Sequence, residues 1–184
     1  MSRDINLLES DFRRDALNLL VACRTLGIEM RPYCTIRDPY KQARLWRQSR
    51  PFSEIERRVN ELKQSGADFL ADVILSVGPQ HGRHVTNAIP GLSWHQWGEA
   101  LDCFWLVDDD SEWSTRRKVV IGDGREINGY KLYGEEARNI GLTSGGFWSR
   151  LKDWPHVQKR QRGVLSYYSL ADIEEEMKRR FPND

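Results

Sequence analysis

The spacing of apolar residues along the chain predicts helices separated by short polar or glycine-containing turns. The first runs over residues 4–26, where apolar side chains recur every three or four positions, and Gly27 follows it as a stop signal. Pro39 is expected to open a second helix, because proline suits the first helical turn. Ser53 and Ser169 are candidate N-caps of later helices. Further helices are expected over residues 53–64, 66–75, 131–140 and 169–180.

Two segments lack the helical period and are predicted to be strands. Residues 28–35 form a short strand, and residues 100–107 are largely apolar, which is typical of a buried strand. Residues 77–91 are rich in Gly, Pro, Asn and His and are expected to form a long loop. These elements indicate the α+β class, with a small antiparallel sheet and surrounding helices.

Length favours a single domain. The chain has 184 residues, which is within the usual size of one domain and enough for a sizeable core. No internal repeat or low-complexity linker divides it. We therefore predict one domain over residues 1–184.

Charge narrows the choice of partners. The chain has 28 Lys and Arg against 27 Asp and Glu, a net charge of +1, whereas domains that bind nucleic acid through bulk charge are strongly basic. No nucleic-acid partner is expected on this ground. One local basic cluster with interleaved aromatic residues has three possible interpretations: a solvated surface, a surface that attracts an anionic cell-wall polymer, or a nucleic-acid-binding surface. Its members are Arg150, Lys152, Lys159, Arg160 and Arg162.

The cysteines and the N-terminal segment indicate the cellular compartment in which the protein is made. The three cysteines form neither an even disulfide set nor a CxxC pair, which indicates a reducing compartment or a protein without bridges. Acidic residues near the N-terminus exclude a secretory segment, and the longest apolar run there is too short for a membrane span. We expect a soluble monomer that is made in the cytoplasm and reaches any target outside it only after release by another agent.

One acidic residue stands inside the apolar strand of residues 100–107. Asp102 has apolar neighbours, and an ionised carboxylate there is costly unless it is paired or binds a metal. His95 precedes it by seven residues, at the end of the long loop, and Gly98 permits a tight passage between them. This spacing favours a ligand on a turn that folds back beside a ligand on a strand.

Asp153 and His156 form a second acidic and imidazole pair, with Pro155 between them. Catalytic zinc commonly takes two histidines and one carboxylate and leaves one position for water. His95, Asp102 and His156 supply that set. Asp153 then remains as a carboxylate that can accept a proton from the water. The residues therefore predict a catalytic Zn²⁺ site.

The segment from Ser93 to Asp102 also resembles a known signature, SxHxxGxAxD. It is the signature of the zinc D,D-carboxypeptidase and L-alanyl-D-glutamate endopeptidase family, which includes vancomycin-resistance D,D-peptidases and many phage endolysins. The resemblance covers roughly residues 33–158. It implies that His95, Asp102 and His156 bind zinc and that the acid of the family's second motif, here Asp153, is the general base.

Other stretches extend this resemblance. Arg37 and Gln42 match the family's RTxxxQxxL stretch, which implies that Arg37 steadies the carbonyl oxygen under attack. Gln42, Ser93 and Trp154 are expected at the substrate, although Trp154 equally suits a packing role. Residues 142–148 are similar to the GLTWGGDW stretch of the endopeptidase subgroup.

The chain departs from the family pattern at several positions. Asp38 replaces a small hydroxyl residue after the arginine, and Ser144 and Phe147 stand where the subgroup usually has Trp and Asp. Residues 51–80 resemble a helical insertion relative to the shortest members. These differences bear on which bond is cleaved more than on the metal chemistry.

The sequence as a whole predicts a zinc metallopeptidase that hydrolyses an amide bond in the stem peptide of peptidoglycan. The subgroup stretch favours an L-alanyl-D-glutamate endopeptidase of the endolysin type, in keeping with phage lysis of a bacterial host. Two alternatives stay open. One is a D-alanyl-D-alanine carboxypeptidase on the same scaffold, and the other is an inactive, metal-stabilised module that binds the cell wall.

Overall fold

The protein is described here by a computed structural model that covers residues 2–122 and 124–182. These residues form two compact units. The sheet unit comprises residues 2–36, 97–122 and 124–161, and the helical unit comprises residues 37–96 and 162–182. The prediction of one domain over the whole chain stays a prediction.

The sheet unit contains the small antiparallel sheet that the sequence predicts. Its strands lie in the order β1-β2-β7-β6, and β3 pairs with the far end of β2. All these pairings are antiparallel, which confirms the α+β class. The strands are β1 (Glu29–Cys34), β2 (Ala100–Val107), β3 (Asp110–Glu112), β6 (Thr143–Ser144) and β7 (His156–Gln158). A separate hairpin joins β4 (Val119–Val120) to β5 (Glu126–Ile127).

Strand β2 has the predicted bounds, and its two faces differ in chemistry. Leu101, Cys103 and Trp105 belong to the hydrophobic core of the sheet unit. Asp102 lies between two of them and therefore points to the opposite face, because successive side chains of a strand alternate. The same alternation on β7 places Val157 in the core and His156 on the face of Asp102.

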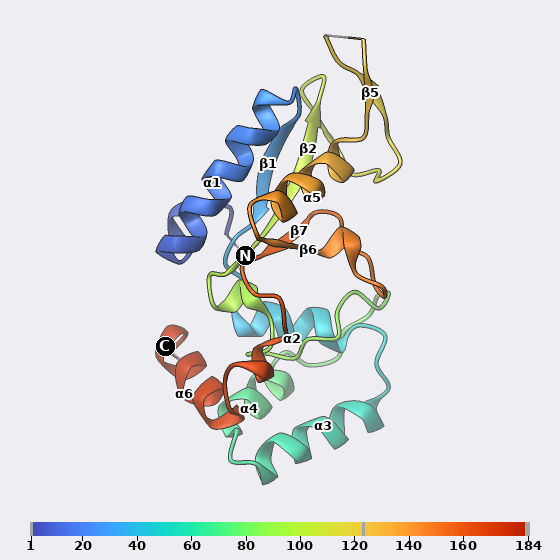
Figure 1. Cartoon of the computed structure of the whole chain (residues 1–184). Helices are drawn as coiled ribbons and strands as arrows, with labels where there is room; N and C mark the ends of the chain where they lie inside the picture. Colours follow the sequence, from blue (N-terminus) through green and yellow to red (C-terminus); the bar gives the residue numbers. More distant parts are fainter. Residues whose placement is uncertain (1, 123, 183–184) are drawn as a thin grey trace. The chain divides into compact units, whose positions relative to one another are not determined.

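Two helices cover the core face of the sheet, α1 (Ser10–Thr25) and α5 (Gly129–Asn139) (Figure 1). Their buried apolar positions recur at helical spacing. The largest of these side chains are Phe12, Leu19, Tyr130 and Tyr133. The hydrophobic core thus holds one face of β2 in place, and the opposite face is available for functional side chains such as Asp102.

The first helix begins later than the sequence predicts. A 3-10 turn, η1 (Ile5–Leu7), comes first, and the extended backbone of Leu8 separates it from α1. The Asp4 side chain accepts a hydrogen bond from the Asn6 amide, so this local cap competes with a continuous helix. The predicted stop is confirmed, since Gly27 adopts a positive φ of 85° just beyond the helix.

The helical unit contains α2 (Pro39–Arg47), α3 (Phe52–Gln64), α4 (Asp68–Ser76) and α6 (Leu170–Arg180) (Figure 1). Pro39 opens α2 as predicted, and the Asp38 carboxylate caps it by accepting from the Lys41 amide at 2.7 Å. Ser169 caps α6 in a capping box with Asp172, also as predicted. Ser53 is not an N-cap, because α3 begins one residue earlier and Pro51 precedes it without a side-chain cap.

The remaining structure consists of loops and short 3-10 turns. Residues 77–91 form the predicted long loop, which leads to η2 (Trp94–Gln96). Two other turns are η3 (Gly145–Phe147) and η4 (Val164–Ser166). Among the described residues, no helix combines the length and apolar character needed to cross a membrane.

Candidate metal centre

Asp102 and His156 are neighbours on strands β2 and β7. The strand register pairs them directly, and the Oδ1 atom of Asp102 lies 2.8 Å from Nδ1 of His156. Both residues are largely buried, with 9% and 7% of their surfaces exposed. A carboxylate and an imidazole are thus held together on the face of the sheet that lies opposite the hydrophobic core.

The other ring nitrogen of His156 is held by an amide. Nε2 lies 3.0 Å from Oε1 of Gln158, while the Gln158 amide nitrogen donates to the Arg160 carbonyl at 2.6 Å. Because an amide oxygen only accepts, the hydrogen bond places a proton on Nε2 of His156. In the neutral ring, the lone pair of Nδ1 then points at the Asp102 carboxylate.

This arrangement suits a bound cation. Two acceptor atoms 2.8 Å apart repel each other unless a positive charge, either a proton or a metal ion, lies between them. An imidazole nitrogen and carboxylate oxygens are ligands that Zn²⁺ takes in catalytic sites. A ligating histidine also usually donates its second ring N–H to another protein group, as His156 does to Gln158. The residues present therefore fit a zinc ion.

Asp153 joins this pair within the sheet unit. One ligand atom from each of Asp102, Asp153 and His156 lies within 4.8 Å of the others. Unlike the other two, Asp153 is exposed. A carboxylate that is open to solvent and adjacent to a buried histidine and aspartate is placed to exchange protons with a water molecule or a substrate.

Two glycines allow Asp153 to approach the end of β6. The Asp153 amide donates to the Gly145 carbonyl at 3.0 Å, and a Cβ on Gly145 would lie 2.5 Å from the Asp153 carbonyl oxygen. A Cβ on Gly146 would overlap the Trp154 ring. Both glycines belong to the stretch that resembles the endopeptidase subgroup. This stretch therefore packs directly against Asp153 and the residue that follows it.

Aromatic rings lie beside the same residues. The Trp148 ring lies 5.2 Å from the His156 ring, and Trp154 packs edge-on against Phe147 at 5.3 Å. Trp154 is half-buried and also packs against the core of the sheet unit. Trp154 therefore has the packing role that the sequence left open, and its expected contact with substrate stays a prediction.

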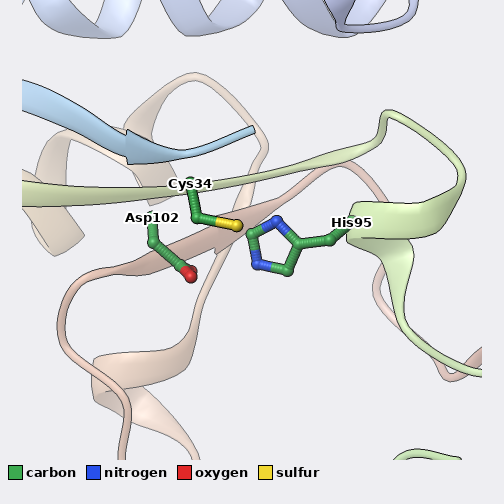
Figure 2. A group of neighbouring side chains, drawn as sticks. All are labelled: Cys34, His95 and Asp102. Carbon is green, nitrogen blue, oxygen red and sulfur yellow. The ribbon is translucent and has the colours of Figure 1, made fainter. Parts of the chain in front are cut away.

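Cys34 is a neighbour of the site that the sequence analysis missed. It ends β1, and the register across an irregularity in that strand pairs it with Asp102. Its Sγ atom lies within 4.8 Å of an Asp102 carboxylate oxygen, and Figure 2 draws the two side chains next to each other. Only the strand pairing could have revealed it. His95, which Figure 2 also labels, belongs to η2 of the helical unit.

The helical unit holds the other predicted site residues. Arg37 donates through a terminal guanidinium nitrogen to Oε1 of Gln42 at 3.1 Å, and the Gln42 amide donates to the Ala88 carbonyl at 2.7 Å. Gln42 is fully buried, so these contacts suit an orienting role toward Arg37. Ser93 is half-buried, and His95 is 2% exposed.

The predicted residues thus fall into two sets. The sheet unit brings together Asp102, Asp153 and His156, with Trp154 alongside. The helical unit contains Arg37, Gln42, Ser93 and His95. The full ligand set of His95, Asp102 and His156 remains a prediction from the sequence.

The local basic cluster is partly neutralised. The Arg160 guanidinium makes two hydrogen bonds, of 2.6 and 2.9 Å, to the carboxylate of Glu99. The Lys159 ammonium lies 3.5 Å from an oxygen of Asp11. Two of the five cluster members are therefore engaged in ion pairs.

Comparisons with known proteins place the chain among peptidoglycan enzymes. A sequence model of the VanY family, described as D-alanyl-D-alanine carboxypeptidase, matches residues 5–117, a segment that contains Arg37, His95 and Asp102. A search of curated proteins found no match.

The chain is also similar to two solved structures. The Serratia marcescens L-Ala D-Glu endopeptidase ChiX is 18% identical, with 84% of this chain and 81% of that chain covered and a TM-score of 0.42. A mutant of the vancomycin-resistance D,D-pentapeptidase VanY, from a VanB-type resistance cassette and in complex with Zn(II), is 16% identical. There the alignment covers 92% of this chain and 78% of that chain, with a TM-score of 0.43.

The family match spans more than half of the sequence and includes two of the predicted metal ligands, His95 and Asp102. The sheet unit independently brings Asp102 together with Asp153 and His156. The chain therefore belongs to the VanY D-alanyl-D-alanine carboxypeptidase family of zinc-dependent peptidoglycan hydrolases.

Proposed function

We propose that this peptidase cleaves the stem peptide of peptidoglycan at the bond between L-alanine and D-glutamate. The observation that carries the catalytic part of the proposal is the grouping of Asp102, Asp153 and His156, whose ligand atoms lie within 4.8 Å of one another. Two buried groups suit metal binding and one exposed carboxylate suits proton transfer.

His95 is proposed as the third metal ligand. It lies in the segment that matches the family model, seven residues before Asp102, and it is buried. Together with Asp102 and His156 it gives the two-histidine, one-carboxylate set of many zinc hydrolases. When bound, zinc polarises the scissile carbonyl and makes a water molecule acidic enough to attack near neutral pH.

Asp153 is proposed as the general base. Its carboxylate accepts a proton from the attacking water and passes it to the nitrogen of the departing amine. Arg37 is proposed to donate hydrogen bonds to the carbonyl oxygen as negative charge develops there. Gln42 supports this role, because its side-chain oxygen accepts from Arg37 and its amide is anchored on the Ala88 carbonyl.

The choice of the L-alanyl-D-glutamate bond rests on residues 142–148. This stretch resembles the endopeptidase subgroup, and its glycines Gly145 and Gly146 pack against Asp153 and Trp154. A terminal D-alanine carboxypeptidase is the second candidate, because the matched family carries that description.

Mass spectrometry of digested muropeptides separates the two activities. Release of the whole stem beginning at D-glutamate supports the endopeptidase, whereas loss of one terminal D-alanine supports the carboxypeptidase. His95→Ala is expected to abolish zinc binding and cleavage together. Zinc-loaded wild-type protein that cleaves neither bond would instead support the inactive binding module.

We further propose an endolysin-type role, in which a single-domain monomer acts on the wall after release from the cytoplasm of a phage-infected or lysogenic host. The subgroup resemblance supports this role. Protein added to isolated cell walls should lower their turbidity, and light scattering after gel filtration should give the 21.5 kDa mass of one chain. Cell walls that stay turbid would contradict the lytic role. The mass of a dimer would contradict the monomer.

A further inference from the structure

The second ring nitrogen of His156 is held by a side chain to which neither the sequence motif nor the proposed reaction assigns a role. We propose that Gln158 is a positioning residue, which fixes His156 so that Nδ1 is the metal-binding nitrogen. This inference rests on the proposed metal site and concerns how that site is held rather than which bond it cleaves.

The hydrogen bonds run in one direction. Nε2 of His156 donates to Oε1 of Gln158 over 3.0 Å, and Nε2 of Gln158 donates to the Arg160 carbonyl over 2.6 Å. The second bond fixes which end of the amide is the oxygen and turns that oxygen toward the imidazole. Gln158 and His156 are two residues apart on β7, so their side chains share one face of the sheet.

The far end of this chain of contacts is also anchored. Arg160 makes its two hydrogen bonds to Glu99, whose side chain is 9% exposed, and the Glu99 carbonyl accepts from the Lys159 amide at 2.9 Å. Gln158 itself pairs with Ala100 at the start of β2. The carbonyl that holds the Gln158 amide therefore belongs to a backbone segment fixed on both sides.

Such a partner has two effects on a ligating histidine. It selects the ring tautomer, and it prevents rotation of the ring away from the metal. A neutral amide does this without adding a negative charge near the metal. Loss of such a contact typically weakens metal binding about 10- to 100-fold.

The test compares zinc affinity between variants, measured by competition with a chromogenic chelator. Gln158→Met, which keeps the side-chain length but can neither accept nor donate at its end, should bind zinc about 10- to 100-fold more weakly than wild type. Gln158→Glu keeps the acceptor and should bind more tightly than Gln158→Met. Gln161→Met makes the same change at an exposed residue three positions on and should leave affinity unchanged.

A spectroscopic readout complements the affinity. The visible absorption of the Co²⁺-substituted protein reports the ligand geometry, so it should change in Gln158→Met and not in Gln161→Met. Circular dichroism establishes that each variant is folded. If Gln158→Met does not fold, Gln158→Asn, which withdraws the amide by one methylene, is expected to weaken zinc binding in the same direction.

The outcomes distinguish this inference from the proposed function. Wild-type zinc affinity in folded Gln158→Met or Gln158→Asn overturns the positioning role and leaves the peptidase proposal intact. A wild-type protein that binds zinc but cleaves no muropeptide overturns the proposed function, while the affinity ratios still decide the role of Gln158. A wild-type protein without zinc affinity overturns both.

Discussion

Residues of the candidate site differ chiefly in their exposure to solvent. Asp102 and His156 are largely buried and directly paired, whereas Asp153 is exposed beside them. Buried polar groups are costly unless they are satisfied, so the first two suit the binding of a metal ion. The exposed carboxylate can meet water and substrate at little cost.

Replacing Asp153 with asparagine should therefore separate metal binding from catalysis. We expect Asp153→Asn to retain zinc and to lose about 10²- to 10⁴-fold in kcat, because the amide cannot accept the proton of the attacking water. Metal analysis and muropeptide hydrolysis measure the two effects. Asp72→Asn, at an exposed position on α4, is the control. Loss of zinc from Asp153→Asn would show that Asp153 is a ligand instead.

At the scale of elements, the turn after β6 sets the position of Asp153, the proposed general base. Strand β6 pairs with β7, and η3 follows it directly, so Gly145 lies against the backbone of Asp153. The absence of a side chain at this point allows a contact that any other residue would prevent. The short strand and its turn thus link the register of the sheet to the loop that carries Asp153.

Gly145→Ala is expected to move Asp153 without unfolding the protein. The added Cβ would lie 2.5 Å from the Asp153 carbonyl oxygen, and a displacement of about 1 Å at a catalytic group can lower the rate on the order of 100-fold. Hydrolysis rates and circular dichroism measure the two properties. Gly163→Ala, where nothing lies within 4 Å of the new Cβ, should behave as wild type. Equal rates in both variants would refute the positional role of the turn.

At the scale of the whole molecule, burial in the hydrophobic core determines which cysteine thiols can react. Cys23 and Cys103 lie in the core of the sheet unit with no exposed surface. Burial raises the pKa of the Cys23 thiol to about 12, with a smaller effect from Glu136, and it raises the pKa of Cys103 as well. Since the thiolate is the reactive form, these groups are inert in the folded protein.

A thiol reagent such as Ellman's reagent should therefore leave native protein unlabelled. We expect three equivalents to react only after unfolding in guanidinium chloride, because none of the three cysteines forms a disulfide and all three are buried. Rapid labelling of the native state would show that the core opens on the time scale of the reaction. Mass spectrometry of the labelled peptides would identify the thiol concerned.

Stability should also depend on pH through helix α6. Hydrogen bonds from Arg179, assisted by Arg180, lower the pKa of Glu176 from 4.5 to about 2. A depressed pKa stabilises the folded state above the unfolded value, and this contribution disappears as the pH falls from about 4.5 toward 2. Glu176→Gln should lower Tm by a few degrees at pH 7, as seen in thermal melts.

The same variant should differ little from wild type near pH 2, where Glu176 is protonated in both the folded and unfolded chains. Glu175→Gln removes an exposed neighbouring carboxylate and controls for the change in net charge. A Tm difference that does not change with pH would exclude an ionic origin.

The sequence by itself determined the features that depend on neighbouring residues. It correctly predicted the bounds of β2, the start of α2 at Pro39 and the stop signal at Gly27, because alternation and capping act over a few positions. The short spacing of Asp153 and His156 likewise predicted that these two residues form one pair, and the structure brings them together. It failed at the start of α1, where a local cap at Asp4 replaced the expected helix.

Tertiary structure decided what depends on pairing between distant strands. Asp102 and His156 are 54 residues apart, and only the register of β2 with β7 brings their side chains to 2.8 Å. The positions of Cys34 beside Asp102 and of Gln158 behind His156 follow from the same pairings. A register shift of one residue would turn these side chains to the other face, and register is set by long-range hydrogen bonds and core packing that no local pattern encodes.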